Sequence, residues 1–305
     1  MRTFAPDTTL VDLEYLGYRE AIATCLLESD GNLALVDPGP ASALAMLKAK
    51  LAQRGLSVGD LAALLLTHIH LDHAGASGVL VRENPRLRVY VHERGAPHLI
   101  DPAKLLASAA RLYGDQMERL WGEVAPVPAV NITTLVGGES IRIGARTIEV
   151  LYTPGHAWHH ATYFDTATGT AFVGDTGGLR RSGRACVLPL TPPPDIDLQA
   201  WAGSLAAIRA RQPRQLFLTH FGPGEDPEAH LAQLEQRLTQ WSDRVRRSMA
   251  DGGPHEVLAA QFAQEVSSEL ASELPEADLR WYAKGAALEQ CWQGLARYWR
   301  KRLSG

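Results

Sequence analysis

Cysteine is scarce in this chain, and the few cysteines that occur are far apart. The 305 residues contain three, Cys25, Cys186 and Cys291, and no two of them form a Cys-x-x-Cys pair. This spacing argues against a disulfide framework and against a zinc site built from cysteines. We therefore expect a reducing, cytoplasmic location.

Long apolar runs and an excess of positive charge are also missing. No stretch of about 18 apolar residues occurs, and the N-terminal residues lack the apolar core of a signal peptide. We therefore expect a soluble protein without a membrane segment. The formal net charge of −4 gives no general attraction for nucleic acid or anionic lipid. A small molecule is accordingly the expected partner, and nucleic acid is not.

The length and composition indicate a globular protein with one large domain or two. Hydrophobic residues make up 46% of the chain and charged residues 21%, which separates it from disordered and fibrous classes. Strand and helix patterns alternate as far as residue 224, and only helical patterns follow. We expect a catalytic domain over residues 1–224 and an α-helical C-terminal extension over residues 225–305.

The most informative stretch is residues 64–75, where an apolar run is followed by three histidines and an aspartate. His68 and His70 are two positions apart, so their side chains leave the same face of an extended segment. Asp72 and His73 follow where the chain must turn. The alternative interpretation is a solvated polar turn after a strand. Imidazoles and carboxylates this close together favour a metal site instead, and one such loop can serve two adjacent metals.

Several other expected strands also end in polar groups. Apolar and β-branched runs bounded by turn residues predict strands over residues 20–27, 32–36, 64–67, 88–92, 140–143, 147–152, 161–164, 170–173 and 215–218. Helical patterns cover residues 41–54, 58–61, 75–82, 102–121 and 198–211. The polar residues that follow strands include His92, His156, Asp175 and His220. Because open α/β sheets gather their chemistry at the carboxyl ends of strands, these positions are further site candidates.

Some polar residues have two interpretations that the sequence does not separate. Asp37 is either a turn or cap residue, or a support for the metal loop. His92 is either structural or a group that contacts substrate or a metal ligand, and His98 is a weaker candidate. His160, four positions after His156, would lie beside the site without binding metal.

Two helical segments have open roles. Residues 102–121 would form one wall of a pocket or cover the core. The segment from residue 225 would shape a substrate pocket, form a homodimer contact or cover a sheet. Its tryptophans are more consistent with core packing than with a cofactor site.

The order of these motifs resembles the metallo-β-lactamase-fold hydrolase superfamily. The matching residues are Thr67-His68-x-His70-x-Asp72-His73, Thr153-Pro154-Gly155-His156, Gly174-Asp175 and Thr219-His220. The resemblance covers roughly the first 225 residues and implies an α+β fold, a four-layer αββα sandwich with metals at one edge of two facing sheets. By resemblance, His68, His70 and His156 would hold one metal, Asp72, His73 and His220 the other, and Asp175 would bridge the two.

The residue types themselves suggest the same chemistry. Five imidazoles and two carboxylates suit two Zn²⁺ ions first, with manganese or iron as alternatives. Two adjacent cations lower the pKa of a shared water and so provide a bridging hydroxide nucleophile at neutral pH. Asp72 would orient that hydroxide and later carry a proton to the leaving group, which makes it the expected catalytic residue.

Departures from particular subfamilies narrow the expected activity. The β-lactamases with two zincs have cysteine at the position of Asp175, and the oxygen-reducing diiron members have glutamate at the position of His70. What remains resembles the glyoxalase-II-like and lactonase-like branch, which hydrolyses thioesters, esters or lactones. Glyoxalase II also has a helical C-terminal extension that binds glutathione, but its contact residues have no match here. The alternatives are a phosphodiesterase or nuclease of the same fold, and a metal-stabilised binding protein without catalysis.

Overall fold

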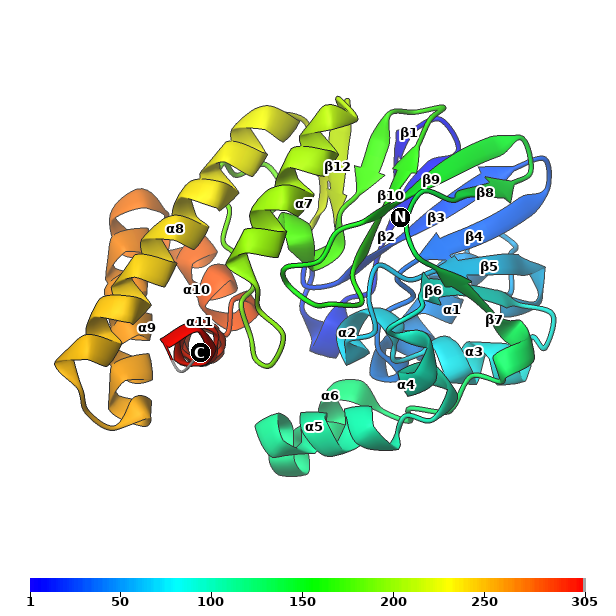
Figure 1. Ribbon diagram of the computed structural model, residues 1–305. Coiled ribbons are helices and arrows are strands. Elements are labelled where there is room, and N and C mark those ends of the chain that lie inside the picture. The colour runs from blue at the N-terminus through cyan, green and yellow to red at the C-terminus, as the bar shows by residue number, and fades with distance from the viewer. Residues whose placement is uncertain (304–305) are drawn as a thin grey trace.

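The computed structural model describes residues 1–303 and contains two mixed β-sheets (Figure 1). The first sheet has seven strands in chain order, antiparallel from β1 to β4 and parallel from β4 to β7. Its strands are β1 (Arg2–Ala5), β2 (Thr8–Asp12), β3 (Ala23–Ser29), β4 (Asn32–Val36), β5 (Leu61–Leu65), β6 (Arg88–His92) and β7 (Ile132–Leu135).

The second sheet has six strands in the order β13-β12-β11-β10-β9-β8, and only β11 and β12 are parallel neighbours. Its strands are β8 (Ser140–Ile143), β9 (Arg146–Tyr152), β10 (Ala161–Asp165), β11 (Thr170–Phe172), β12 (Gln215–Leu218) and β13 (Gly222–Gly224).

Alternating side chains divide the core into layers. Leu64 and Leu66 pack against helices on the outer face of the first sheet, whereas Leu65 between them points toward the second sheet. This is the period of two that an extended strand imposes. Ile148, Tyr163 and Phe172 of the second sheet complete the layer between the sheets. The helices on the outer face of the first sheet are α1 (Leu44–Ala52), α3 (Ser77–Glu83) and α4 (Ala96–Ile100).

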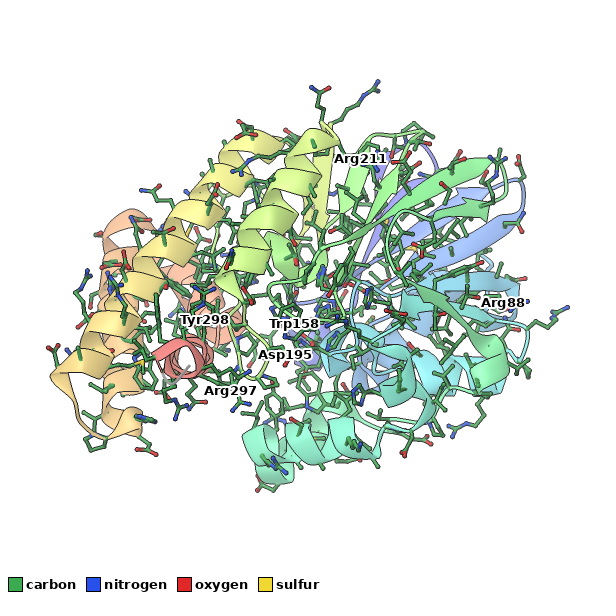
Figure 2. All side chains as sticks on the ribbon, in the orientation of Figure 1. Arg88, Trp158, Asp195, Arg211, Arg297 and Tyr298 are labelled. Atoms are coloured by element: carbon green, nitrogen blue, oxygen red, sulfur yellow. The ribbon has the colours of Figure 1, made fainter. Side chains whose placement is uncertain are left out.

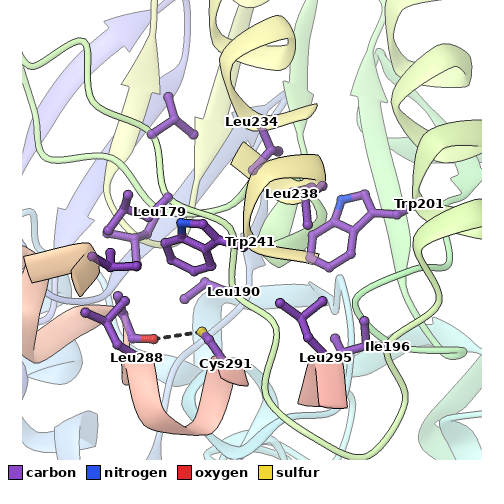
Figure 3. Close-up of a cluster of buried hydrophobic side chains, with 14 of the residues drawn as sticks. Leu179, Leu190, Ile196, Trp201, Leu234, Leu238, Trp241, Leu288, Cys291 and Leu295 are labelled. Atoms are coloured by element: carbon purple, nitrogen blue, oxygen red, sulfur yellow. Dashed lines mark hydrogen bonds between the residues drawn. The ribbon is translucent and has the colours of Figure 1, made fainter. Parts of the chain in front are cut away.

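The outer face of the second sheet is covered by α7 (Leu198–Ala210) and by the C-terminal helices. These helices are α8 (Pro227–Asp251), α9 (His255–Glu273), α10 (Glu276–Gly285) and α11 (Leu288–Leu303). Figure 3 shows Trp201 of α7, Trp241 of α8 and Leu295 of α11 in one buried cluster. The four-layer αββα sandwich expected from the sequence is therefore confirmed, with the C-terminal helices packed onto one of its outer layers.

A helical insertion projects beside the first sheet toward the C-terminal helices (Figure 1). It was expected as one helix over residues 102–121 but is broken into α5 (Ala103–Tyr113), a 3-10 turn (Gly114–Gln116) and α6 (Met117–Trp121). Gly114 ends α5 with a φ of 52°, a left-handed conformation that interrupts a right-handed helix.

Other element boundaries also differ from the expectation. The strand expected at residues 64–67 runs over Leu61–Leu65, and a loop connects it to α2 (Leu71–Ala74). The N–H of Leu66 still donates to the carbonyl oxygen of Tyr90 on β6. The helix expected from residue 75 is α3, which begins at Ser77. The remaining 3-10 turns are Tyr15–Gly17, Ala41–Ala43, Val58–Asp60, Ala129–Asn131 and Gly174–Gly177. No helix within residues 1–303 is long and apolar enough to cross a membrane.

Candidate metal centre

The loop between β5 and α2 presents the first four polar side chains of the site. Thr67 fixes its start, because its N–H and its hydroxyl both donate to the buried carboxylate of Asp37. His68 and His70 follow on the loop, and Asp72 and His73 lie on α2. The turn predicted from the sequence is therefore one helical turn.

Three imidazoles converge in the first group of donor atoms. Nε2 of His68 and Nε2 of His156 lie 2.9 and 3.0 Å from Nδ1 of His70. A tetrahedral zinc ion with bonds of about 2.0–2.1 Å places its nitrogen ligands about 3.3 Å apart. The spacing of the three nitrogens thus fits one shared cation. His156 reaches them from the loop after β9, on the opposite sheet.

Asp72, His73 and His220 form the second group. Nε2 of His220 lies 3.2 Å from the nearer oxygen of Asp72, and Nε2 of His73 lies 3.7 Å from the same oxygen. His220 follows β12. All donor atoms of this group lie within 4.8 Å of one another, as do those of the first group together with Asp175.

Asp175 lies between the two groups. Its Oδ1 is 3.1 Å from Nε2 of His73, and its Oδ2 is 3.5 Å from Nε2 of His156. One carboxylate oxygen therefore faces each group, as a bridging ligand requires. Asp175 lies on the 3-10 turn after β11, which begins at Gly174 with a φ of 43°. A Cβ at Gly174 would lie 2.5 Å from the Thr67 hydroxyl, so this approach requires glycine.

In three of the histidines the nitrogen that faces away from the site is hydrogen-bonded. Nδ1 of His156 donates to the carbonyl oxygen of Leu190 at 2.8 Å, and Nδ1 of His220 donates to that of Ala21 at 3.0 Å. His73 Nδ1 lies 2.8 Å from Oδ2 of Asp37. Such bonds fix the tautomer in which the lone pair of Nε2 points at the site.

Asp37 therefore supports the metal loop rather than serving only as a turn residue. Its Oδ2 also accepts hydrogen bonds from the hydroxyls of Thr67 and Thr219. The residue is fully buried and has a φ of 51°, which an aspartate tolerates when local bonds hold it.

Burial and local charge set the protonation states of the site. Burial lowers the pKa of His70 to about 3, and burial with neighbouring imidazoles holds the pKa of His68 well below its usual value. Burial alone would raise the pKa of Asp72, but the imidazoles of His73 and His220 lower it to about 2. In the second group burial alone would lower the pKa of His73 and of His220, but the carboxylates of Asp175 and Asp72 raise both above the usual value. Neutral imidazoles and ionised carboxylates are the forms that bind metal, so a cation at the second group would displace protons from these two imidazoles.

Two buried atoms provide a direct test of fit. Nε2 of His73 and Oδ1 of Asp175 are both buried, and although they lie 3.1 Å apart, neither forms a hydrogen bond of acceptable geometry. Buried polar atoms without partners are costly, and a cation between the groups would satisfy both. The donor set and its geometry therefore fit a pair of metal ions.

Comparison with known proteins decides the family. The family model described as metallo-beta-lactamase superfamily matches residues 18–221. This chain belongs to the metallo-beta-lactamase superfamily. The resemblance noted in the sequence is therefore confirmed at the level of the family.

Curated relatives match part of their own length. A metallo-beta-lactamase fold-containing protein, ST1585 of Sulfurisphaera tokodaii, is 28% identical over 56% of this chain and 65% of its own. A hydroxyacylglutathione hydrolase of a Synechococcus strain is 30% identical over 48% of this chain and 46% of its own. The chain thus spans about half to two thirds of these relatives.

Solved structures agree with the superfamily fold. A metallo-beta-lactamase family protein of Thermus thermophilus, TTHA1429, has a TM-score of 0.72 at 23% identity and covers 97% of this chain and 94% of its own. ST1585 has a TM-score of 0.60 at 23% identity and covers 76% of this chain and 86% of its own. At this identity the likeness shows the fold alone.

The other histidines divide into site neighbours and a structural residue. His160 donates from Nδ1 to the Thr153 hydroxyl at 2.9 Å, and its ring centroid lies 5.2 Å from that of His68. It therefore lies beside the candidate metal centre. His92 stacks on Tyr152 with ring centroids 4.3 Å apart, and its Nδ1 accepts a hydrogen bond from the N–H of Arg94, which are structural contacts. His98, the weaker candidate, does line a cavity beside the site.

Sequence reasoning missed His159. Its ring stacks on that of His68 with centroids 6.1 Å apart, and it lines the same cavity as His98. It stands between His156, which a motif explains, and His160, which was identified only by its distance from His156, and nothing in its own spacing marks it. The residues of the C-terminal helices that line the site were also missed. Helical periodicity identifies the buried face of a helix but not the part of the protein that this face contacts.

Two cavities open onto the metal groups. The first, of about 300 Å³, is lined by α5, by the proline-rich loop at residues 192–194 and by the start of α11. The second, of about 540 Å³, lies between the 15–22 segment, α6 and α10. Asp72 and His220 line both. The helical insertion (α5 and α6) therefore forms a wall of both cavities, which is one of the two roles expected for it from the sequence.

Proposed function

We propose that this protein is a dinuclear metal-dependent hydrolase of a small thioester, ester or lactone. The observation that carries the proposal is the position of Asp175, which directs one oxygen at each of two histidine groups. Asp72 and His220 of the second group lie at the junction of two cavities large enough for the two halves of a small substrate, and His70 of the first group lines the first cavity.

The ligand sets are proposed as His68, His70 and His156 for one cation, Asp72, His73 and His220 for the other, and Asp175 for both. The proposed metal is zinc, with manganese or iron as alternatives. When bound, such a pair supplies an ionised water at neutral pH and polarises the oxygen of the bond to be cleaved.

Asp72 is the proposed catalytic residue. Its side chain is 24% exposed and lines both cavities, so it can contact substrate as well as metal. The imidazoles of His73 and His220 hold its pKa at about 2, so its carboxylate is ionised at neutral pH and can orient the attacking water through a hydrogen bond. The proposed proton transfer to the leaving group rests on its position beside both cavities and not on this low pKa.

The walls of the site favour an organic acyl compound over a phosphodiester polymer. Leu105, Leu112 and Trp121 line the first cavity together with a run of three prolines. The relatives named hydroxyacylglutathione hydrolase support a thioester in particular. A cytoplasmic location, a small-molecule partner and a homodimer contact on the tail stay predictions.

A hydrolysis panel with metal analysis tests the proposal. The zinc-loaded full chain is offered thioesters, lactones and phosphodiesters, beside an Asp72→Ala variant. We expect turnover of a thioester or lactone, and a loss on the order of a hundredfold or more in the variant. Cleavage of phosphodiesters alone would contradict the proposed substrate class. A metal-replete protein that cleaves nothing in the panel would contradict the proposal that the protein is a hydrolase.

A further inference from the structure

The second cavity has a polar rim that metal binding does not use. Four cationic side chains line it, and they come from the N-terminal segment, the loop after β11 and the C-terminal helix α10. They are Arg19, Arg181, Arg280 and Lys284. The one carboxylate among its lining residues is Asp72, which belongs to the metal site.

Two of these cations are already neutralised. Arg181 forms ion pairs with Glu20 and with the buried Asp278. Arg280 pairs with Glu276 one turn earlier on the surface of α10. Carboxylates of the protein itself therefore offset the charges of these two arginines.

Arg19 and Lys284 remain without a carboxylate partner in the described part of the chain. Nζ of Lys284 lies over the ring of Tyr18, 3.9 Å from its centroid. A cation–π contact holds an ammonium group in place but leaves its charge available to an anion. Arg19 and Lys284 are both exposed and both line the second cavity, which places the two charges at its mouth.

A second contact also joins α10 to the N-terminal segment. Nε1 of Trp281, on α10, donates to the carbonyl oxygen of Glu20 at 2.9 Å, across 261 positions of sequence. Trp281 also lines the cavity, together with Leu16, Ile22 and Leu179. The tail helix is thus fixed to the N-terminal segment around an apolar chamber whose mouth is positively charged.

We propose that the substrate carries a carboxylate or phosphate group, which binds Arg19 and Lys284 at the mouth of the second cavity. The bond to be cleaved lies at the junction with the first cavity, and the rest of the molecule occupies that cavity. This inference rests on the proposed hydrolase function. It defines the substrate class as an acyl compound with one apolar and one anionic end.

Four matched butyryl thioesters test the charge preference with the zinc-loaded full chain. Their thiol parts are 3-mercaptopropionate, 2-mercaptoethyl phosphate, uncharged 2-mercaptoethanol and cationic thiocholine. These thiols differ in intrinsic reactivity, so the deciding quantity is the change in the anion-to-neutral ratio of kcat/KM between wild type and variant. We expect Lys284→Glu and Arg19→Glu each to lower that ratio about tenfold, the lower end for a charge-assisted bond at an exposed site.

Control variants separate a local contact from a change in net charge. Arg88→Glu makes the same charge change at an exposed arginine that points away from the molecule (Figure 2) and should leave the ratio unchanged. Lys284→Arg should retain most of the preference. The larger effect among the carboxylate and phosphate arms identifies the anion. Equal ratios in wild type and both charge-reversal variants would overturn the inference while leaving the hydrolase proposal intact.

Binding of uncleavable thioethers keeps the test independent of turnover. The Kd of S-butyl-3-mercaptopropionate and that of its phosphate counterpart are measured by calorimetry. We expect at least one to weaken about tenfold in Lys284→Glu and neither to change in Arg88→Glu. Anion-selective binding by a protein that cleaves no thioester would support the anion site and contradict a thioester as the substrate, and a protein inert toward the whole hydrolysis panel would contradict the hydrolase. Equal binding of both thioethers to wild type and Lys284→Glu would contradict the anion site.

Discussion

Oδ2 of Asp37 lies 2.8 Å from Nδ1 of His73, and both side chains are fully buried. The same oxygen accepts the hydroxyls of Thr67, before the first histidine, and of Thr219, before the last. One carboxylate thus joins the segments that present His68, His73 and His220. The two groups of candidate ligands are thus held in position by a carboxylate that belongs to neither group.

Asp37→Asn should weaken metal binding without unfolding the protein. An amide keeps the shape but removes the charge and one of the two acceptor oxygens, so the His73 tautomer is no longer fixed. We expect metal affinity to fall about 10–100-fold in a competition titration with a chromophoric chelator. Asp30→Asn is the control, because Asp30 also has a positive φ, of 48°, but lies in an exposed turn. Equal affinities for wild type and Asp37→Asn would contradict this role.

His230 should make stability fall in mild acid. Its Nε2 donates to the carbonyl oxygen of Gly177, beside Asp175, while its buried Nδ1 has no partner. Burial lowers the pKa of His230 to about 4. Below an unfolded pKa of about 6.5 the unfolded chain binds a proton that the folded chain refuses, so stability is lost as the pH falls.

The measurement is urea unfolding of wild type and His230→Gln between pH 7 and pH 4. The free energy of unfolding of wild type, relative to the variant, should fall by roughly 2–3 kcal/mol across this range. Because both proteins keep the same metal ligands, loss of metal in acid affects them alike. A relative stability that does not change with pH would show that His230 does not titrate in this way.

Gly294 should prove necessary for docking α11. A Cβ there would meet the carbonyl oxygen of Thr191, at the start of the proline-rich loop that lines the first cavity. Gly294→Ala should therefore destabilise the protein by about 1–3 kcal/mol, measured by denaturant unfolding. Gly203→Ala is the matched control in α7, where a Cβ would meet nothing and the helix should gain about 0.5–1 kcal/mol. Similar effects of the two substitutions would contradict the close packing.

The sequence predicts the strands that have a clear alternating pattern and misses those that lack one. The expected strands at residues 88–92 and 140–143 match β6 and β8, because β-branched residues alternate there between clear turn signals. The edge strands β1 and β13 were not expected. The latter is Gly-Pro-Gly, which has no strand pattern and forms only because β12 offers a free edge.

The seven candidate ligands follow from sequence because each motif directly follows a strand, and the topology brings those strand ends together. The structure brings all seven into two adjoining groups, and their role in binding metal stays a prediction. The substrate walls could not be read in this way. Lys284 meets Tyr18 only because α10 packs back on the N-terminal segment, and no local pattern carries that contact.

Metal stoichiometry tests the central claim most directly. Wild-type protein is loaded with zinc and freed of excess metal, and its metal content is measured by inductively coupled plasma mass spectrometry. We expect about two zinc ions per chain. Asp175→Ala, which removes the carboxylate between the two groups, should retain fewer and bind them more weakly. A wild-type protein that retains no metal, or a variant that holds two ions as tightly as wild type, would contradict the account.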